Sequence, residues 1–283
     1  GTFDADTNDL ALTVTALATI SGGTFTASSA AAATFNGGLT ISGGTLTGAA
    51  GTVDVNGALT LSSGTLTAPS GTFTVNGNWN VTGGTFTPGT NTVTLDGTSA
   101  TLTITSTSTS FYNLTFNGSG ATWTLQDALD VDNTLTITNG ALNANSLAIT
   151  VTVNWVNNGT FTPGTGTVTF NGSGTQVLNS GGTSSGKTFY NVTHTGSGTI
   201  QVTVNAVSMT GAFTNSAGTW EANGKAVTVT GLATISGGTY FARIGTQTFG
   251  GLTISGGTFT GAGGTVDVNG ALTLSSGTLT APS

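Results

Sequence analysis

The sequence predicts an all-β protein, built as a parallel β-solenoid with about 20 residues per coil. Three consecutive blocks, 36–55, 56–75 and 76–95, support this prediction because they align without gaps. Each block contains three short segments in which apolar residues alternate with threonine, separated by corners that contain glycine. The composition agrees with the class, since β-branched residues are abundant, whereas the helix-favouring Glu, Lys, Arg and Gln are scarce.

The apolar positions of the three blocks coincide. Successive side chains of a strand point to opposite faces, so the apolar residues face one side and the threonines the other. The apolar residues form five columns: Leu39/Leu59/Trp79, Ile41/Leu61/Val81, Leu46/Leu66/Phe86, Val53/Phe73/Val93 and Val55/Val75/Leu95. A single coil buries too little to offset an entropy loss of about 1–2 kcal/mol per residue. Coils must therefore stack, and parallel crossovers favour a right-handed solenoid.

The corners leave a second interpretation open. Asn56-Gly57 is a typical two-residue hairpin turn, which would pair Val55 with Ala58 and make the sheet antiparallel. That pairing leaves apolar side chains on both faces of the sheet, which is hard to bury. The turn at Gly43-Gly44 suits a hairpin better, because it pairs Ile41 with Leu46. The stack is preferred, with an antiparallel sandwich or barrel as the alternative.

A larger repeat spans the chain. Residues 38–70 recur almost unchanged at 251–283. We therefore expect 1–283 to be a single continuous solenoid segment of a longer repeat protein, in which 1–217 is one large repeat and 218–283 opens the next.

The middle of the chain, 96–217, is less regular. Residues 102–110 are largely an alternation of Thr and Ser, and 171–187 resemble a flexible insertion rich in Gly and Ser. We expect coils to continue through this region, with longer corners at these two places.

Charge and composition argue against several classes of function. The chain has three Lys and Arg residues against ten Asp and Glu, a net charge of −7, and no basic stripe for nucleic acid. No apolar run approaches the length of a membrane-spanning helix, so we expect no membrane insertion of this segment. There is no cysteine, and therefore no disulfide or thiolate metal site.

Two groups of side chains are candidate calcium ligands: Asp4, Asp6 and Asn8 in the first, Asp130 and Asp132 in the second. Oxygen ligands at alternate positions are how a calcium loop begins, and the second pair would share one face of a strand. The first group departs from such a loop, because Asp9 and Thr15 stand where Gly and Glu are needed. A solvated corner is the plainer interpretation, and no other cofactor is predicted.

No catalytic site is predicted, and we do not expect an enzyme. Glycoside hydrolysis needs paired carboxylates, whereas the acids here are scattered. His194 has no carboxylate nearby in the sequence and is expected to point outward from a strand. Trp79 falls on an inward column. An exposed pair among Trp123, Trp155, Trp220 and Tyr112 would form a platform for sugar rings.

Thr-x-Thr pairs recur at the same place in successive blocks: Thr45/Thr47, Thr65/Thr67, Thr85/Thr87 and Thr258/Thr260. Stacked, they would form a ladder of hydroxyl and methyl groups, similar in that respect to the flat arrays of ice-binding solenoids. The plainer interpretation is that threonine is a favoured outward residue of a strand.

Coils of the type GxLTISGGTLT resemble the β-strand repeat regions of large secreted bacterial surface proteins, similar to filamentous haemagglutinin and autotransporters. The resemblance covers nearly all the chain and implies a structural extracellular filament, stalk or adhesin shaft at the cell surface, without catalytic residues. Expected partners are other copies of the chain or adjoining repeats, end to end or bundled laterally, because uncapped strand edges recruit further strands. A carbohydrate-binding adhesin module and an ice-binding threonine array are the alternatives.

Overall fold

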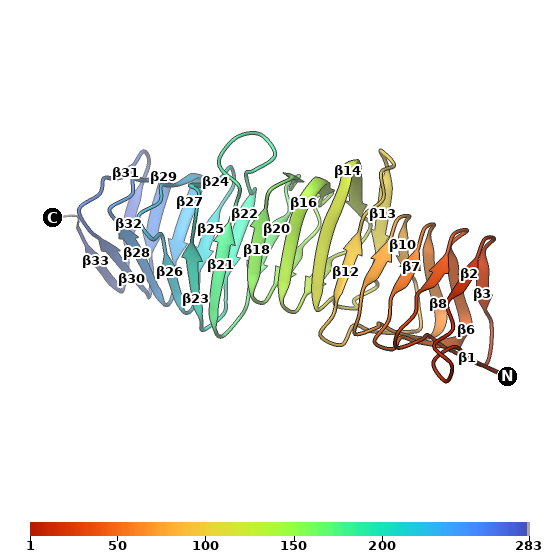
Figure 1. Cartoon of the computed structure of the whole chain (residues 1–283). Coiled ribbons are helices and arrows are strands. Elements are labelled where there is room, and N and C mark those ends of the chain that lie inside the picture. Colours follow the sequence, from red (N-terminus) through yellow and green to blue (C-terminus); the bar gives the residue numbers. More distant parts are fainter. Residues whose placement is uncertain (282–283) are drawn as a thin grey trace. The chain divides into compact units, whose positions relative to one another are not determined.

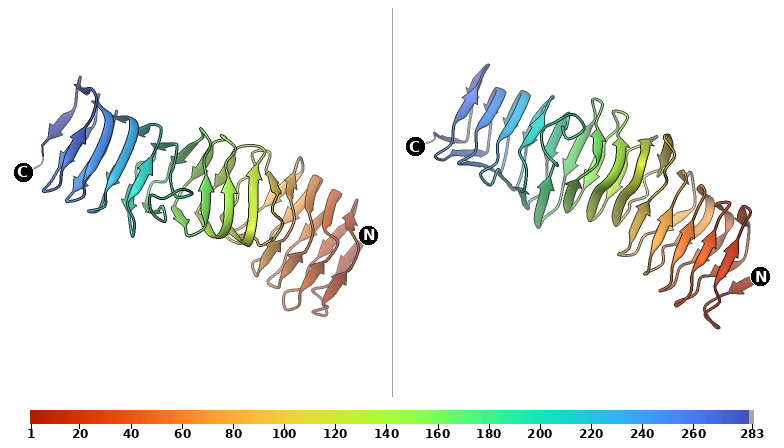
Figure 2. Two further views of the ribbon diagram at one scale, coloured as in Figure 1. Left: turned by 90° about the horizontal axis from the view of Figure 1, so that it is seen from above. Right: turned by 45° about the horizontal axis from the view of Figure 1, so that its top comes forward.

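The computed structural model describes residues 1–281, which form strands, turns and bends but no helix. The strands pair in parallel and form a β-solenoid of about 14 turns with roughly 20 residues per coil, which confirms the predicted fold class. The chain comprises two compact units. Unit 1 contains Gly1–Val131 and Ile137–Leu142, and unit 2 contains Asp132–Thr136 and the chain from Asn143 onward. Figure 1 labels the strands of each unit, and Figure 2 shows them stacked side by side within it.

Unit 1 contains β1 to β15 and part of β16 (Thr134–Asn143). The first fifteen are short strands and three longer ones that turn a corner: β1 (Thr2–Asp4), β2 (Leu12–Val14), β3 (Ala18–Ile20), β4 (Thr24–Thr26), β5 (Ala33–Phe35), β6 (Leu39–Thr47), β7 (Val53–Val55), β8 (Leu59–Thr67), β9 (Phe73–Val75), β10 (Trp79–Val81), β11 (Thr85–Thr87), β12 (Thr92–Leu95), β13 (Leu102–Thr105), β14 (Asn113–Leu125) and β15 (Leu129–Val131).

Unit 2 contains the rest of β16 and the remaining strands: β17 (Ile149–Val151), β18 (Asn154–Asn157), β19 (Thr160–Thr162), β20 (Thr167–Phe170), β21 (Thr175–Asn179), β22 (Asn191–His194), β23 (Thr199–Val202), β24 (Val207–Met209), β25 (Phe213–Asn215), β26 (Thr219–Glu221), β27 (Val227–Ile235), β28 (Thr239–Arg243), β29 (Gln247–Ile254), β30 (Thr258–Gly261), β31 (Val266–Val268), β32 (Leu272–Leu274) and β33 (Thr278–Thr280). The repeat boundary at residue 217, defined by sequence similarity, falls inside this unit, between β25 and β26.

The predicted columns of apolar side chains exist. Leu59 of β8 lies in register between Leu39 of β6 and Trp79 of β10, and all three are fully buried. Val55 pairs with Val75 in a parallel ladder, so the hairpin that would have joined it to Ala58 is not formed. Backbone hydrogen bonds run from coil to coil, as from the Leu59 N–H to the Asn78 carbonyl (2.9 Å). The core is the interior of the stack.

Glycine is needed where corners lie directly on one another. Gly64 has φ +84°, and a Cβ at this position would lie 2.1 Å from the carbonyl oxygen of Gly44 in the preceding coil. A backbone in that conformation, with a neighbour that close, leaves no room for a side chain. This close stacking is the physical reason for glycine at this corner.

The irregular middle contains more regular structure than the sequence indicates. Within 171–187, which we predicted as a flexible insertion, β21 pairs with β23 and buries Gln176 and Leu178. That part of the prediction is wrong, because polar Gly and Ser neighbours mask a short alternating strand. The long corner begins only after β21, and the connection from β21 to β22 loops out of the stack (Figure 1).

Two aromatic triads of the core have the same arrangement, one in each unit. Trp79 packs against Phe86 and Phe111, with ring centroids 5.0 and 4.9 Å apart. In unit 2, the rings of Trp155, Phe161 and Phe189 repeat this arrangement, with centroids 4.8 and 5.2 Å apart. Large aromatic side chains thus fill the interior in both units.

Candidate functional site

The first acidic group lies in the turn between β1 and β2, where its carboxylates hold the backbone. Asp4 accepts hydrogen bonds from the Asp6 N–H (2.9 Å) and the Thr7 hydroxyl (2.7 Å). The Thr7 hydroxyl and the backbone N–H groups of Asp6 and Thr7 lower the pKa of Asp4. Asp6 Oδ1 accepts the N–H of Ser29 in the next coil (2.6 Å). Asn8 is exposed. These carboxylates act as caps of a turn.

The second acidic group does not form the expected strand face. Asp130 is half-buried on β15, which ends at Val131, so the exposed Asp132 lies beyond the strand. Asp127 caps a neighbouring corner instead, with Oδ1 accepting the Ser106 N–H at 2.9 Å. Among residues 1–281, no group of three or more His, Cys, Asp or Glu side chains is placed to hold a metal ion.

The prediction that His194 points outward is wrong. Its side chain is fully buried on β22, with Nδ1 2.7 Å from Oδ1 of Asn215 in the next coil. Burial lowers the pKa of His194, and Nε2 meets no hydrogen-bond partner within the described chain. The sequence did carry a signal for this position: Val192 is an inward residue, and residues two apart on a strand share a face.

The indole side chains are all in the core. Trp79, as predicted, and also Trp123, Trp155 and Trp220 are fully buried. Each occupies an inward strand position and packs against phenylalanine, as Trp220 does against Phe213 with centroids 4.7 Å apart. The exposed tryptophan platform proposed for sugar rings is therefore not formed.

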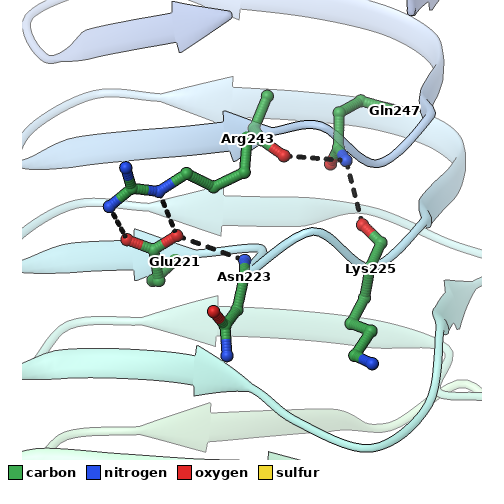
Figure 3. Close-up of polar contacts among 6 residues, drawn as sticks. Glu221, Asn223, Lys225, Arg243 and Gln247 are labelled. Carbon is green, nitrogen blue, oxygen red and sulfur yellow. Dashed lines mark hydrogen bonds and ion pairs between the residues drawn. The ribbon is translucent and has the colours of Figure 1, made fainter. Parts of the chain in front are cut away.

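A polar cluster in unit 2 joins consecutive coils (Figure 3). Arg243 Nε and one terminal nitrogen each lie 2.7 Å from a carboxylate oxygen of Glu221, and the guanidinium carbon lies 5.2 Å from the ring centroid of Phe241. The hydrogen bond from Arg243 is the main reason that the pKa of Glu221 is lowered. Arg243 itself sits at a β-bulge with φ +56°, so the ion pair holds an irregular corner in place.

Gln247 satisfies the backbone beneath that corner. Its buried amide nitrogen donates to the carbonyl oxygens of Lys225 (3.1 Å) and Gly245 (2.9 Å), while its Oε1 accepts the hydroxyl of the buried Tyr240. Burial raises the pKa of Tyr240. Most buried polar groups in proteins are hydrogen-bonded in this way, because an unpaired one costs free energy. The cluster therefore has a structural role, and the sequence pattern did not reveal it.

Residues Gly181 to Thr188 match the pattern G-x-x-x-x-G-K-[ST] of phosphate-binding loops, which our reading of the sequence missed. The pattern binds phosphate when the loop leads into a helix N-terminus. Here the loop leads into the bridge residue Phe189 and β22, without a helix. Lys187 Nζ is turned toward the carbonyl oxygens of Asn157 (3.3 Å) and Gly159. The match therefore does not form a phosphate site.

The most regular surface feature is a block of eight threonines on four consecutive coils of unit 1, here called the threonine array: Thr24, Thr26, Thr45, Thr47, Thr65, Thr67, Thr85 and Thr87. The pairs lie in parallel register from β4 through β6 and β8 to β11. All eight side chains are half-buried or exposed on the outer face. The stacking predicted for the Thr-x-Thr pairs of the first three blocks is thus confirmed.

Comparison with known proteins found no similar protein. No protein-family model matches the chain, and no curated protein or solved structure is significantly similar to it. No helix among the described residues has the length and apolar character needed to cross a membrane.

Proposed function

We propose that the chain is a segment of a structural extracellular filament, a stalk or adhesin shaft built by stacking coils. The observation that supports this proposal is the coil-to-coil register, in which the same kind of side chain lies over its equivalent at each step, as in Leu39, Leu59 and Trp79. In such a stack, stability is nearly a sum of neighbour contacts, so length can be extended without redesign of the core. A shaft needs this property.

The proposed partner at one end is an adjoining repeat. Leu272 and Leu274 on β32 are 54% and 52% exposed. Their sequence equivalents in the first repeat, Leu59 and Leu61, are 0% exposed because β10 packs on them. The proposal is that an adjoining repeat packs on β32 in the register in which β10 packs on β8.

Extending the chain with a copy of residues 71–96 tests the partner. We expect the added coil to raise the thermal stability of unit 2 and to protect the amides of β32 from hydrogen exchange. A scrambled extension of the same composition is the control. Equal protection by both extensions would contradict stacking.

The filament itself is tested by electron microscopy of the chain and of a tandem fusion of two copies. We expect rods whose length grows in proportion to the number of coils. Compact particles from either sample would overturn the proposal.

The extracellular location is supported by the resemblance to secreted repeat proteins and by the small number of trypsin sites, three Lys and Arg in all. We expect the native protein to survive trypsin and high salt, and an antibody to label intact cells of the source organism. Rapid digestion of the native chain, or labelling only after permeabilisation, would contradict it. The three tryptophans named for the sugar-binding alternative are buried, which leaves the half-buried Tyr112 as the aromatic residue of that group at the surface.

A further inference from the structure

The threonine array is regular in two directions. Adjacent coils repeat about every 4.7–4.9 Å, and two threonines on one strand lie about 6.7 Å apart, twice the rise per residue. Threonine is β-branched, so few side-chain rotamers are available and the hydroxyl and methyl groups repeat with the backbone. The array thus presents hydroxyl and methyl groups on a two-dimensional lattice.

The hydroxyl groups of the array are unused by the protein. None of the eight donates a side-chain hydrogen bond to another described residue, in contrast to the nearby Thr74, whose hydroxyl donates to Asp54 Oδ1 (2.5 Å). These hydroxyl groups are available to hydrogen-bond to water or to a bound surface. A ligand that engages all eight must have the same two-dimensional repeat, which is a property of a solid surface rather than of a small molecule.

The chemistry of the array limits which kind of solid surface it could bind. No charged side chain lies within it, although Asp4 borders it beside Thr26, and an ionic mineral calls for charged groups. Crystalline polysaccharide calls for exposed aromatic rings that stack on sugars, whereas the four tryptophans are buried. The hydroxyl groups of the array can hydrogen-bond to water, and the methyl groups beside them order water. This combination suits the regular lattice of water molecules at an ice surface.

We propose that the threonine array of unit 1 binds ice. The site is independent of the filament, since it needs only four coils of one unit. The second repeat shows that the fold does not require threonine here: the equivalent of Thr26 is Phe241, and the equivalent of Asp4 is Glu221. A bulky side chain is therefore tolerated on such a face, which makes the proposal testable without unfolding the protein.

The experiment measures thermal hysteresis and uptake into a growing ice front with the whole chain. Thr65→Tyr lies in the middle of the array. Thr234→Tyr is the matched control, because Thr234 lies in a ladder of unit 2 that is only one threonine wide. The ladder consists of Thr150, Thr169, Thr193, Thr214, Thr234, Thr253 and Thr273. Circular dichroism checks that both variants keep the β-sheet signal.

We expect hysteresis and ice uptake by the unmodified chain and the Thr234→Tyr variant, and loss of both in Thr65→Tyr. Exclusion of the unmodified chain from ice would overturn the proposal. So would equal activity of the two variants, or binding to microcrystalline cellulose or chitin without hysteresis. Self-association abolished by Thr65→Tyr, without hysteresis, would assign the array to contact between copies instead.

Discussion

Leu59 and Leu272 occupy the same place in the same repeated sequence, yet their surroundings differ. Leu59 lies between Leu39 and Trp79 and is 0% exposed, whereas Leu272 contacts Leu252 on one side and is 54% exposed. Truncating a buried leucine to alanine costs about 2–5 kcal/mol, from lost burial and the cavity left behind. Leu59→Ala should therefore lower the stability of unit 1 by that amount.

For Leu272→Ala we expect about 0.7–1.5 kcal/mol, since only about half of a 1.5–3 kcal/mol burial term is present. Stacked repeats do not unfold in a single two-state step. Hydrogen exchange resolved by peptide is therefore the assay, with the opening free energy of β8 and β32 compared in each variant and in the unmodified chain. An equal cost for the two substitutions would refute the idea that coil-on-coil burial stabilises the solenoid.

Three further outcomes are expected. In Asp96, burial and the neighbouring charge of Asp54 raise the pKa, and Oδ1 has no partner within the described chain. Asp96→Asn should stabilise unit 1 by about 1 kcal/mol at neutral pH, and thermal melts should show this gain shrinking as the pH falls and the carboxyl group of the parent becomes neutral. Burial lowers the pKa of His194, so the unfolded chain takes up a proton at a higher pH than the folded chain does. The free energy of unfolding should therefore be highest above about pH 6.5, the ordinary pKa of histidine, and should fall as the pH is lowered. His194→Gln should flatten this decline between pH 7 and 5, and an unchanged pH profile would contradict the argument. Gly64→Ala should lower the opening free energy of β8, measured by hydrogen exchange, by more than about 1 kcal/mol because of its positive φ and the Gly44 carbonyl. Gly263→Ala is the control for Gly64→Ala: its Cβ would approach no atom closer than 4.0 Å, and the first repeat has Ala50 there. Equal losses at Gly64 and Gly263 would rule out the corner argument.

The alternation of inward and outward side chains along each strand explains why sequence-based prediction succeeded for some residues and failed for others. In the regular blocks, alternation placed Leu59 and Trp79 in the core correctly, because each strand repeats the same two-residue pattern. His194 was predicted to point outward because it is polar, although the alternation places it on the inward face, and it is buried in the structure. A buried pair such as His194 and Asn215 compensates for its own polarity, which cannot be recognised from one strand alone.

The one-dimensional pattern determined the class of the fold, the length of the coil and the sides on which leucines and threonines fall, because these depend on local alternation and on copying at a fixed period. Tertiary structure alone decided that the Asn56-Gly57 and Gly43-Gly44 corners continue a parallel stack and do not form hairpins, because the local pattern at these corners suits either arrangement. Tertiary structure also decided which buried polar groups are hydrogen-bonded. Gln247 accepts a hydrogen bond from Tyr240, for example, and the two residues lie on different strands, at a spacing in the sequence that the repeat does not fix.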